Sequence, residues 1–94
     1  MARAVWNGAV IAESDRVETL EGNLYFPRAA VKAGLLRDSD HTTVCGWKGV
    51  ARYHDIAVDG RVNPAAAWFY PDPKPAAGAI RDHVAFWRGV TIEP

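Results

Sequence analysis

The 94-residue sequence contains one cysteine, so no intramolecular disulfide can form and no CxxC pair is present to hold zinc. An excess of charge of one sign is also missing, because eleven Lys and Arg residues balance eleven Asp and Glu residues. Nucleic-acid-binding faces and membrane-docking segments usually carry clustered basic residues, so we expect neither of these partners. The spacing of His41, His54 and His83 matches no metal-ligand signature, so we expect no metal or other cofactor.

Long hydrophobic runs are absent as well. The longest apolar stretches, such as GAVIA and AAAWFY, are far shorter than the roughly 20 residues that a membrane-spanning helix needs. The first ten residues, MARAVWNGAV, lack the continuous apolar region of a signal peptide. We therefore expect a soluble, cytoplasmic protein, and its length is typical of a single domain over residues 1–94.

The elements that are present are mostly short strands between turn residues. Asn7-Gly8 separates two β-rich runs and predicts a type I′ hairpin. Glu21-Gly22 and Asp59-Gly60 predict two further turns. Strands are expected at or near 3–6, 9–13, 42–58, 83–87 and 90–92, with short extended pieces on both sides of Glu21-Gly22. Such a pattern predicts a mainly β fold, a small antiparallel two-sheet sandwich or a partly open barrel.

Only two short helices are expected. The segment PRAAVKAGLL combines good helix formers with a proline at its start and Gly34 as a stop, which favours one to two helical turns. A second short helix is expected at 76–82. The intervening RDSDHTT, residues 37–43, is interpreted as a polar loop, and PDPKP as a rigid loop that cannot pair.

The run VCGWKGVARYHDIAV, residues 44–58, is interpreted as one strand with a bulge or bend at Gly46 and Gly49. Strand alternation then places a ring at Trp47 and another at Tyr53 on one face, with Gly49 and Ala51 between them. This leaves a slot in the sheet surface. The slot is a pocket floor if it stays empty and ordinary core packing if another part of the chain fills it.

Ten aromatic residues are more than one modest core buries easily, so part of the cluster is expected at the surface. A recognition surface and a thin core closed by tryptophan both remain open. The candidate ligand-binding residues are Trp47, Lys48, Tyr53, Trp68 and Tyr70.

Candidate catalytic residues are those whose side chains could transfer protons or bind an anion near the same surface. Cys45 is not among them, because an isolated strand cysteine usually behaves as a small buried apolar residue. The catalytic candidates are Lys48, Glu21, Tyr25 and His54.

Four sequence blocks and the N-terminal hairpin together span nearly the whole chain; the blocks are EGNLYFP, TVCGWKGVARY, AAWFYPDP and IRDHVAFW. In this order they resemble the bacterial family known as domain of unknown function 427. Gly46 stands where the family pattern often has proline. The resemblance implies a compact tent-like β fold, similar to that of methionine sulfoxide reductase B and the drug-binding domain of cereblon. Those relatives commonly hold zinc through two cysteine pairs, which this sequence lacks. The family has also been labelled nucleotidyltransferase-like, but the Gly-Ser and paired-Asp signature of such enzymes is missing here.

Three functions follow as hypotheses. The leading one is a module that binds a small molecule or a peptide end in an aromatic-lined cleft. The first alternative is a small transferase- or hydrolase-like enzyme that uses the catalytic candidates in the same cleft. The second alternative is a homo-oligomeric structural or interaction domain, in which exposed aromatic residues form a homodimer interface.

Overall fold

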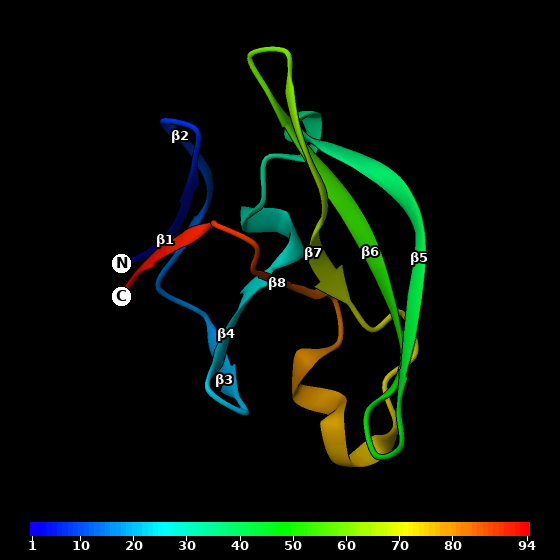
Figure 1. Ribbon diagram of the computed structural model, residues 1–94. Helices are drawn as coiled ribbons and strands as arrows, with labels where there is room; N and C mark the ends of the chain where they lie inside the picture. Colours follow the sequence, from blue (N-terminus) through cyan, green and yellow to red (C-terminus); the bar gives the residue numbers. More distant parts are fainter.

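The computed structural model describes residues 1–94, which form nine strands in two antiparallel sheets (Figure 1). In the smaller sheet the strand order is β2-β1-β9. Asn7 and Gly8 connect the first two strands with φ angles of 49° and 77°, as a two-residue hairpin turn requires. The two ends of the chain lie side by side here, because β9 pairs with β1. The three strands are β1 (Ala2–Trp6), β2 (Ala9–Ser14) and β9 (Thr91–Glu93).

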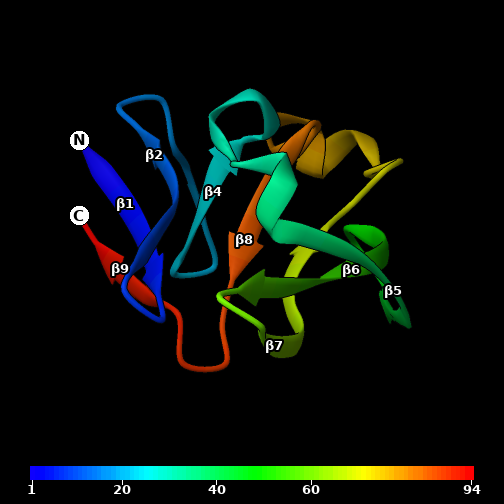
Figure 2. The same cartoon turned by 90° about the horizontal axis from the view of Figure 1, so that it is seen from above.

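The larger sheet has six strands in the order β3-β4-β8-β7-β6-β5. Seen from above, the smaller sheet lies at the left, β4 and β8 in the middle, and β5, β6 and β7 at the right (Figure 2). The strands are β3 (Glu18–Leu20), β4 (Asn23–Pro27), β5 (Leu36–Cys45), β6 (Gly49–Val58), β7 (Arg61–Phe69) and β8 (His83–Phe86).

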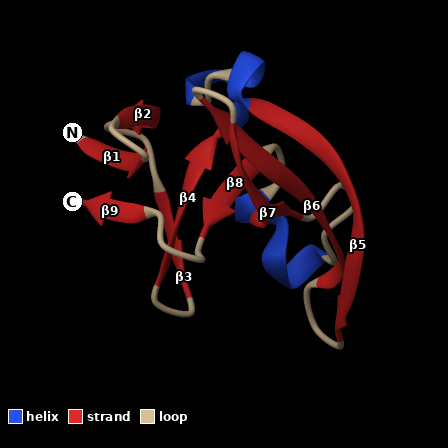
Figure 3. Cartoon of the chain, turned by 45° about the horizontal axis from the view of Figure 1, so that its top comes forward, coloured by secondary structure: helices blue, strands red, loops and turns tan.

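The helical segments are three short 3₁₀ turns, drawn in blue in Figure 3: η1 (Arg28–Ala30), η2 (Ala33–Leu35) and η3 (Pro75–Ile80). The single helix expected over PRAAVKAGLL is therefore wrong, since two separate turns stand there. Val31 between them is extended and bridges Ala12, while the Lys32 N–H donates to the Ile11 carbonyl at 2.9 Å. These contacts with β2 outweigh the local helical preference. The short helical segment predicted at 76–82 is present as η3.

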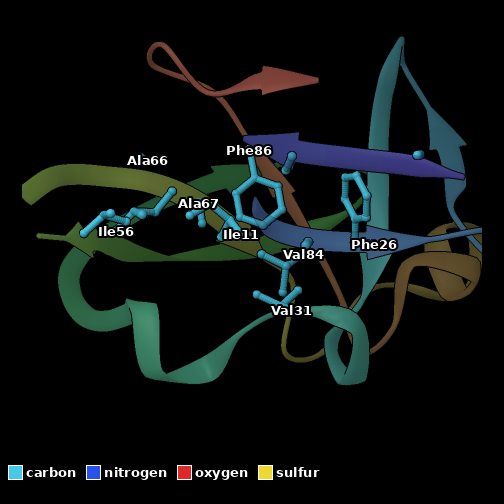
Figure 4. Packing of buried hydrophobic residues seen from close by; sticks show 12 residues of the cluster. Ile11, Phe26, Val31, Ile56, Ala66, Ala67, Val84 and Phe86 are labelled. Atoms are coloured by element: carbon cyan, nitrogen blue, oxygen red, sulfur yellow. The ribbon is translucent and has the colours of Figure 1, made fainter. Parts of the chain in front are cut away.

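Buried apolar side chains form two clusters, because neighbouring residues on a strand point to opposite faces. In β8, Val84 and Phe86 belong to the first cluster, whereas Ala85 belongs to the second. The first cluster joins residues of the smaller and larger sheets, among them Ile11 and Phe26 (Figure 4). The second cluster, which includes residues of η3, comprises Tyr25, Ala51, Tyr53, Ala65, Tyr70, Ala77, Ile80 and Ala85.

Two predictions about the middle of the chain are wrong. Residues 37–43 are not a loop but part of β5, whose pairing with β6 is irregular between Asp38 and Thr42. Residues 42–58 are not one bent strand, because the chain reverses after Cys45 and returns from Gly49, which pairs with it. The polar sequence of β5 forms a strand because its backbone is hydrogen-bonded to β6, and an edge strand needs few buried side chains.

The predicted fold class is confirmed: the chain is mainly β, with two antiparallel sheets and a few short helical turns. Both sheets are open. None of the helical segments has the length and apolar character needed to cross a membrane.

Candidate functional site

A pocket of about 150 Å³ opens beside the second cluster, between the first half of β6, the end of β7 and the residue after β8. Four of the five residues that line it were predicted from the sequence as ligand-binding; the fifth, Trp87, was not. Strand alternation could have predicted Trp87, because Phe86 points into the first cluster and the residue after it must face the other way. That these residues bind a ligand stays a prediction. The lining residues are Lys48, Tyr53, Trp68, Tyr70 and Trp87.

Hydrogen bonds and ring contacts hold the two tryptophans of the pocket. Trp68 donates its indole N–H to the Tyr25 hydroxyl at 3.1 Å, and Trp87 donates its own to the Ala65 carbonyl at 2.6 Å. The Trp68 and Trp87 rings pack edge to face, with centroids 5.9 Å apart and planes at 78°. Both polar N–H groups are thus satisfied inside the protein, which leaves the pocket wall apolar.

Tyr53, which pairs with Trp68 between β6 and β7, is held in the same manner. The hydroxyl groups of Tyr53 and Thr43 are hydrogen-bonded at 2.9 Å, and the His41 ring packs against Tyr53 with centroids 4.5 Å apart. Tyr70 is buried, and the burial raises the pKa of its phenol. The phenol therefore remains neutral at physiological pH.

Lys48 contributes the only charge in the pocket, and it is the only buried polar or charged side chain of the molecule, 8% exposed. Its Nζ donates to Glu21 Oε1 and lies 5.5 Å from the Tyr70 ring and 5.6 Å from the Trp47 ring. Its backbone carbonyl accepts a hydrogen bond from the Lys74 N–H at 2.9 Å, which ties the turn to the loop before η3.

The Lys48–Glu21 pair is charged on both sides. The hydrogen bond from Lys48 lowers the pKa of the Glu21 carboxyl. Burial of Lys48 acts to lower its pKa, but the hydrogen bond with Glu21 and the nearby tyrosines outweigh burial and raise it. At neutral pH the pocket therefore presents an ammonium group rather than a free amine.

Tyr25 lies behind the pocket. Its side chain is fully buried, and this burial raises its pKa despite the hydrogen bond from Trp68. The hydroxyl orients the Trp68 indole and does not line the pocket. Tyr25 thus positions Trp68 and would not contact a ligand in the pocket.

His54 lies outside this pocket, although it was predicted to share one cleft with Lys48. It lines a separate polar hollow of about 330 Å³ with Asp38 and Phe69, and its ring stacks on Phe69 at 4.8 Å. Arg28 Nη1 donates to its Nε2 at 3.2 Å, since a guanidinium cannot accept. Burial and the Arg28 charge lower the pKa of His54. Nowhere do three His, Cys, Asp or Glu side chains group as a metal-ligand set.

The slot expected between Trp47 and Tyr53 is filled by the protein itself. Ala51 is buried in the second cluster, and a Cβ on Gly49 would stand 3.2 Å from the Asp72 carbonyl oxygen. Trp47 lies in the turn before β6, is 40% exposed, and does not line the pocket. The pocket that the structure contains is therefore displaced from the predicted one, toward β7 and the end of β8.

Fold and site together define a small two-sheet β domain with an aromatic-walled pocket that contains one lysine. The chain belongs to the family described as Domain of unknown function (DUF427), whose family model matches residues 1–93. The resemblance seen in the four sequence blocks is thereby confirmed. A search of curated proteins finds no significant match.

Proposed function

We propose that the protein is a binding module whose aromatic pocket holds a small molecule or a peptide end through one ring-sized apolar group. The size of the pocket supports this proposal. A volume of about 150 Å³ is comparable to that of an apolar cavity that accepts benzene, and is smaller than the roughly 300–1,000 Å³ of drug-sized sites.

The contacts that fix the pocket walls are the observation that carries the proposal. Trp68 and Trp87 are held by satisfied indole N–H groups and by their mutual edge-to-face packing. A wall that is already ordered loses little conformational entropy when a ligand enters. The exposed faces of these rings then supply apolar contact area at low cost.

The enzyme hypothesis has less support from the geometry. Of its four candidates, only Lys48 lines the pocket, Glu21 is bonded to it, Tyr25 is buried behind Trp68, and His54 lies in another hollow. A raised pKa keeps Lys48 protonated, which makes it a poor base or nucleophile at neutral pH. A binding role requires none of these proton transfers.

The homodimer hypothesis rests on a different surface. Val44 and Val50 pair across the β5–β6 hairpin and remain 80% and 47% exposed, next to the exposed Trp47. Light scattering at low and high protein concentration tests it, since a dimer would double the mass as concentration rises. A concentration-independent monomer mass would rule out the homodimer.

The binding proposal is tested by following the four indole N–H signals in nuclear magnetic resonance spectra during titration with toluene and with indole. Trp68 and Trp87 line the pocket, whereas Trp6 packs against the first cluster on the other side of the larger sheet. We expect saturable shifts at Trp68 and Trp87 and none at Trp6. Equal shifts at all tryptophans, or no saturable shift, would contradict the proposal.

The variant Trp87→Ala removes one wall of the pocket. Because Trp87 is 41% exposed and lies after the last residue of β8, we expect the variant to fold. Affinity for the ring probes should fall about tenfold, the loss expected for one aromatic contact. Trp6→Phe, which alters only the first cluster, should leave the affinity unchanged.

A further inference from the structure

Lys48 has unused hydrogen-bonding capacity inside the pocket. An ammonium group carries three N–H donors, and the structure pairs Nζ with one acceptor, Glu21 Oε1. The residue is more than nine-tenths buried and lines the pocket, so the pocket is where a second acceptor can reach the remaining donors. A buried charge that is incompletely paired is unfavourable, and an entering acceptor would relieve this.

The position of the ammonium also defines the charge of the ligand. Aromatic pockets often bind cations over their ring faces, but here Nζ of Lys48 already lies 5.5 Å from the Tyr70 ring. A cationic ligand would be repelled by this resident charge. An anionic group beside the ring contacts would be attracted by it.

The carboxylate of Glu21 binds this ammonium group but lies outside the pocket. It lies in the turn between β3 and β4, its side chain is 47% exposed, and it does not line the pocket. Lys48 is its only ion-pair partner. Since Glu21 is half exposed, its carboxylate is readily solvated when a ligand carboxylate takes its place on Lys48.

Resting on the proposed function, we infer that the pocket selects a ring that carries a carboxylate, and that Glu21 competes with this carboxylate for the Lys48 ammonium. The ring would lie against Trp68 and Trp87, and the carboxylate would accept hydrogen bonds from Nζ. In the free protein the Glu21 carboxylate neutralises the buried charge.

The test compares four probes of one ring size: benzoate, benzamide, benzylamine and toluene. Each is titrated into the full-length protein at constant ionic strength, with the Trp68 and Trp87 indole signals as the readout. We expect benzoate to bind most tightly and benzylamine most weakly. The amide, which is neutral but of the same shape, separates charge from shape.

The variant Glu21→Gln removes the competing charge with little change in shape. We expect it to fold, because the amide oxygen of glutamine can still accept a hydrogen bond from Lys48 Nζ. Benzoate should bind it about two- to fivefold more tightly than the wild type, as expected for the loss of a competing carboxylate that is itself half exposed. Toluene should bind equally to both proteins. Glu18→Gln is the matched control, because Glu18 is exposed on β3, makes no ion pair, and loses the same charge.

The outcomes separate the two proposals. Saturable binding of toluene with no preference for benzoate, and no gain in Glu21→Gln, would overturn the carboxylate inference and leave the binding proposal standing. An equal gain in Glu18→Gln would assign the effect to overall charge and overturn the inference as well. If none of the four probes shifts Trp68 or Trp87, the proposed function itself fails.

Discussion

Lys48 and His54 are both largely buried ionisable residues, yet their surroundings favour opposite charge states. Lys48 faces the Glu21 carboxylate, so its ammonium form is stabilised against the cost of burial. His54 faces the Arg28 guanidinium, which adds to burial and favours the neutral ring. Burial favours the neutral form at both residues, and the charge of the neighbouring group opposes burial at Lys48 and reinforces it at His54.

The lowered pKa of His54 predicts acid sensitivity. A hydrogen bond with the Arg37 backbone and the charges of Asp38 and Asp55 oppose the shift in pKa, but burial and Arg28 outweigh them. The folded protein therefore binds a proton at His54 less readily than the unfolded chain, whose value is near 6.5. The free energy of unfolding should be unaffected by this group above that pH, and should decrease as pH falls below it toward the pKa of the folded state.

The measurement is urea unfolding between pH 7.5 and 5.5 for the wild type and His54→Gln. Glutamine can still accept the Arg28 hydrogen bond but does not titrate. The variant should show a flatter dependence of unfolding free energy on pH. Identical slopes for the two proteins would show that His54 does not govern this range.

Among the elements, the β5–β6 hairpin determines where the pocket lies. Its turn carries Lys48, and the Lys74 side chain and backbone bond to the Gly46 and Lys48 carbonyls at 2.6 and 2.9 Å. Gly49 ends the turn with φ of +119°, directly under the Asp72 carbonyl. Because the loop before η3 covers Gly49 so closely, Lys48 is directed to the pocket and Trp47 is left outside.

Gly49→Ala should therefore be destabilising. A residue with a Cβ rarely adopts this φ, and the added atom would meet Asp72 O at 3.2 Å, so we expect a loss of about 1–3 kcal/mol in unfolding free energy. Gly46→Ala is the matched control in the same turn, since its Cβ would contact nothing within 4 Å. It should change stability by less than about 0.5 kcal/mol. Equal effects in thermal or urea unfolding would refute this account of the turn.

In the whole molecule, the larger sheet contributes to both apolar clusters. Consecutive residues of β4, β7 and β8 point into different clusters, for example Val84 into the first and Ala85 into the second. Neither cluster can therefore form without these strands. Ile56 of β6 belongs to the first cluster and Ile80 of η3 to the second, and both are almost fully buried. We therefore propose that residues 1–94 unfold as one cooperative unit.

Ile56→Val and Ile80→Val test this proposal as a matched pair. Each removes one buried methylene and should lower the free energy of unfolding by about 0.5–1.5 kcal/mol. Both variants should shift one common transition when followed by tryptophan fluorescence and by far-ultraviolet circular dichroism. Two separate transitions, each sensitive to one variant, would show that the clusters unfold independently.

Local sequence was enough to predict the hairpins at Asn7-Gly8 and Asp59-Gly60, because positive φ angles at such pairs need no distant contact. The mainly β class followed from the same turns. Lys48 and three of the aromatic pocket residues were also predicted, since aromatic residues in excess of a small core must lie near its edge.

Tertiary structure alone decided the rest, because the outcome depended on contacts between distant segments. β5 formed from a polar sequence by pairing with β6, and Val31 became extended by pairing with Ala12. The loop at Asp72 closed the expected slot at Gly49, while Trp87 joined Trp68 to form the pocket that remains open. No pattern of neighbouring residues encodes which distant side chain occupies a given space, so the position of the site was decided only by folding.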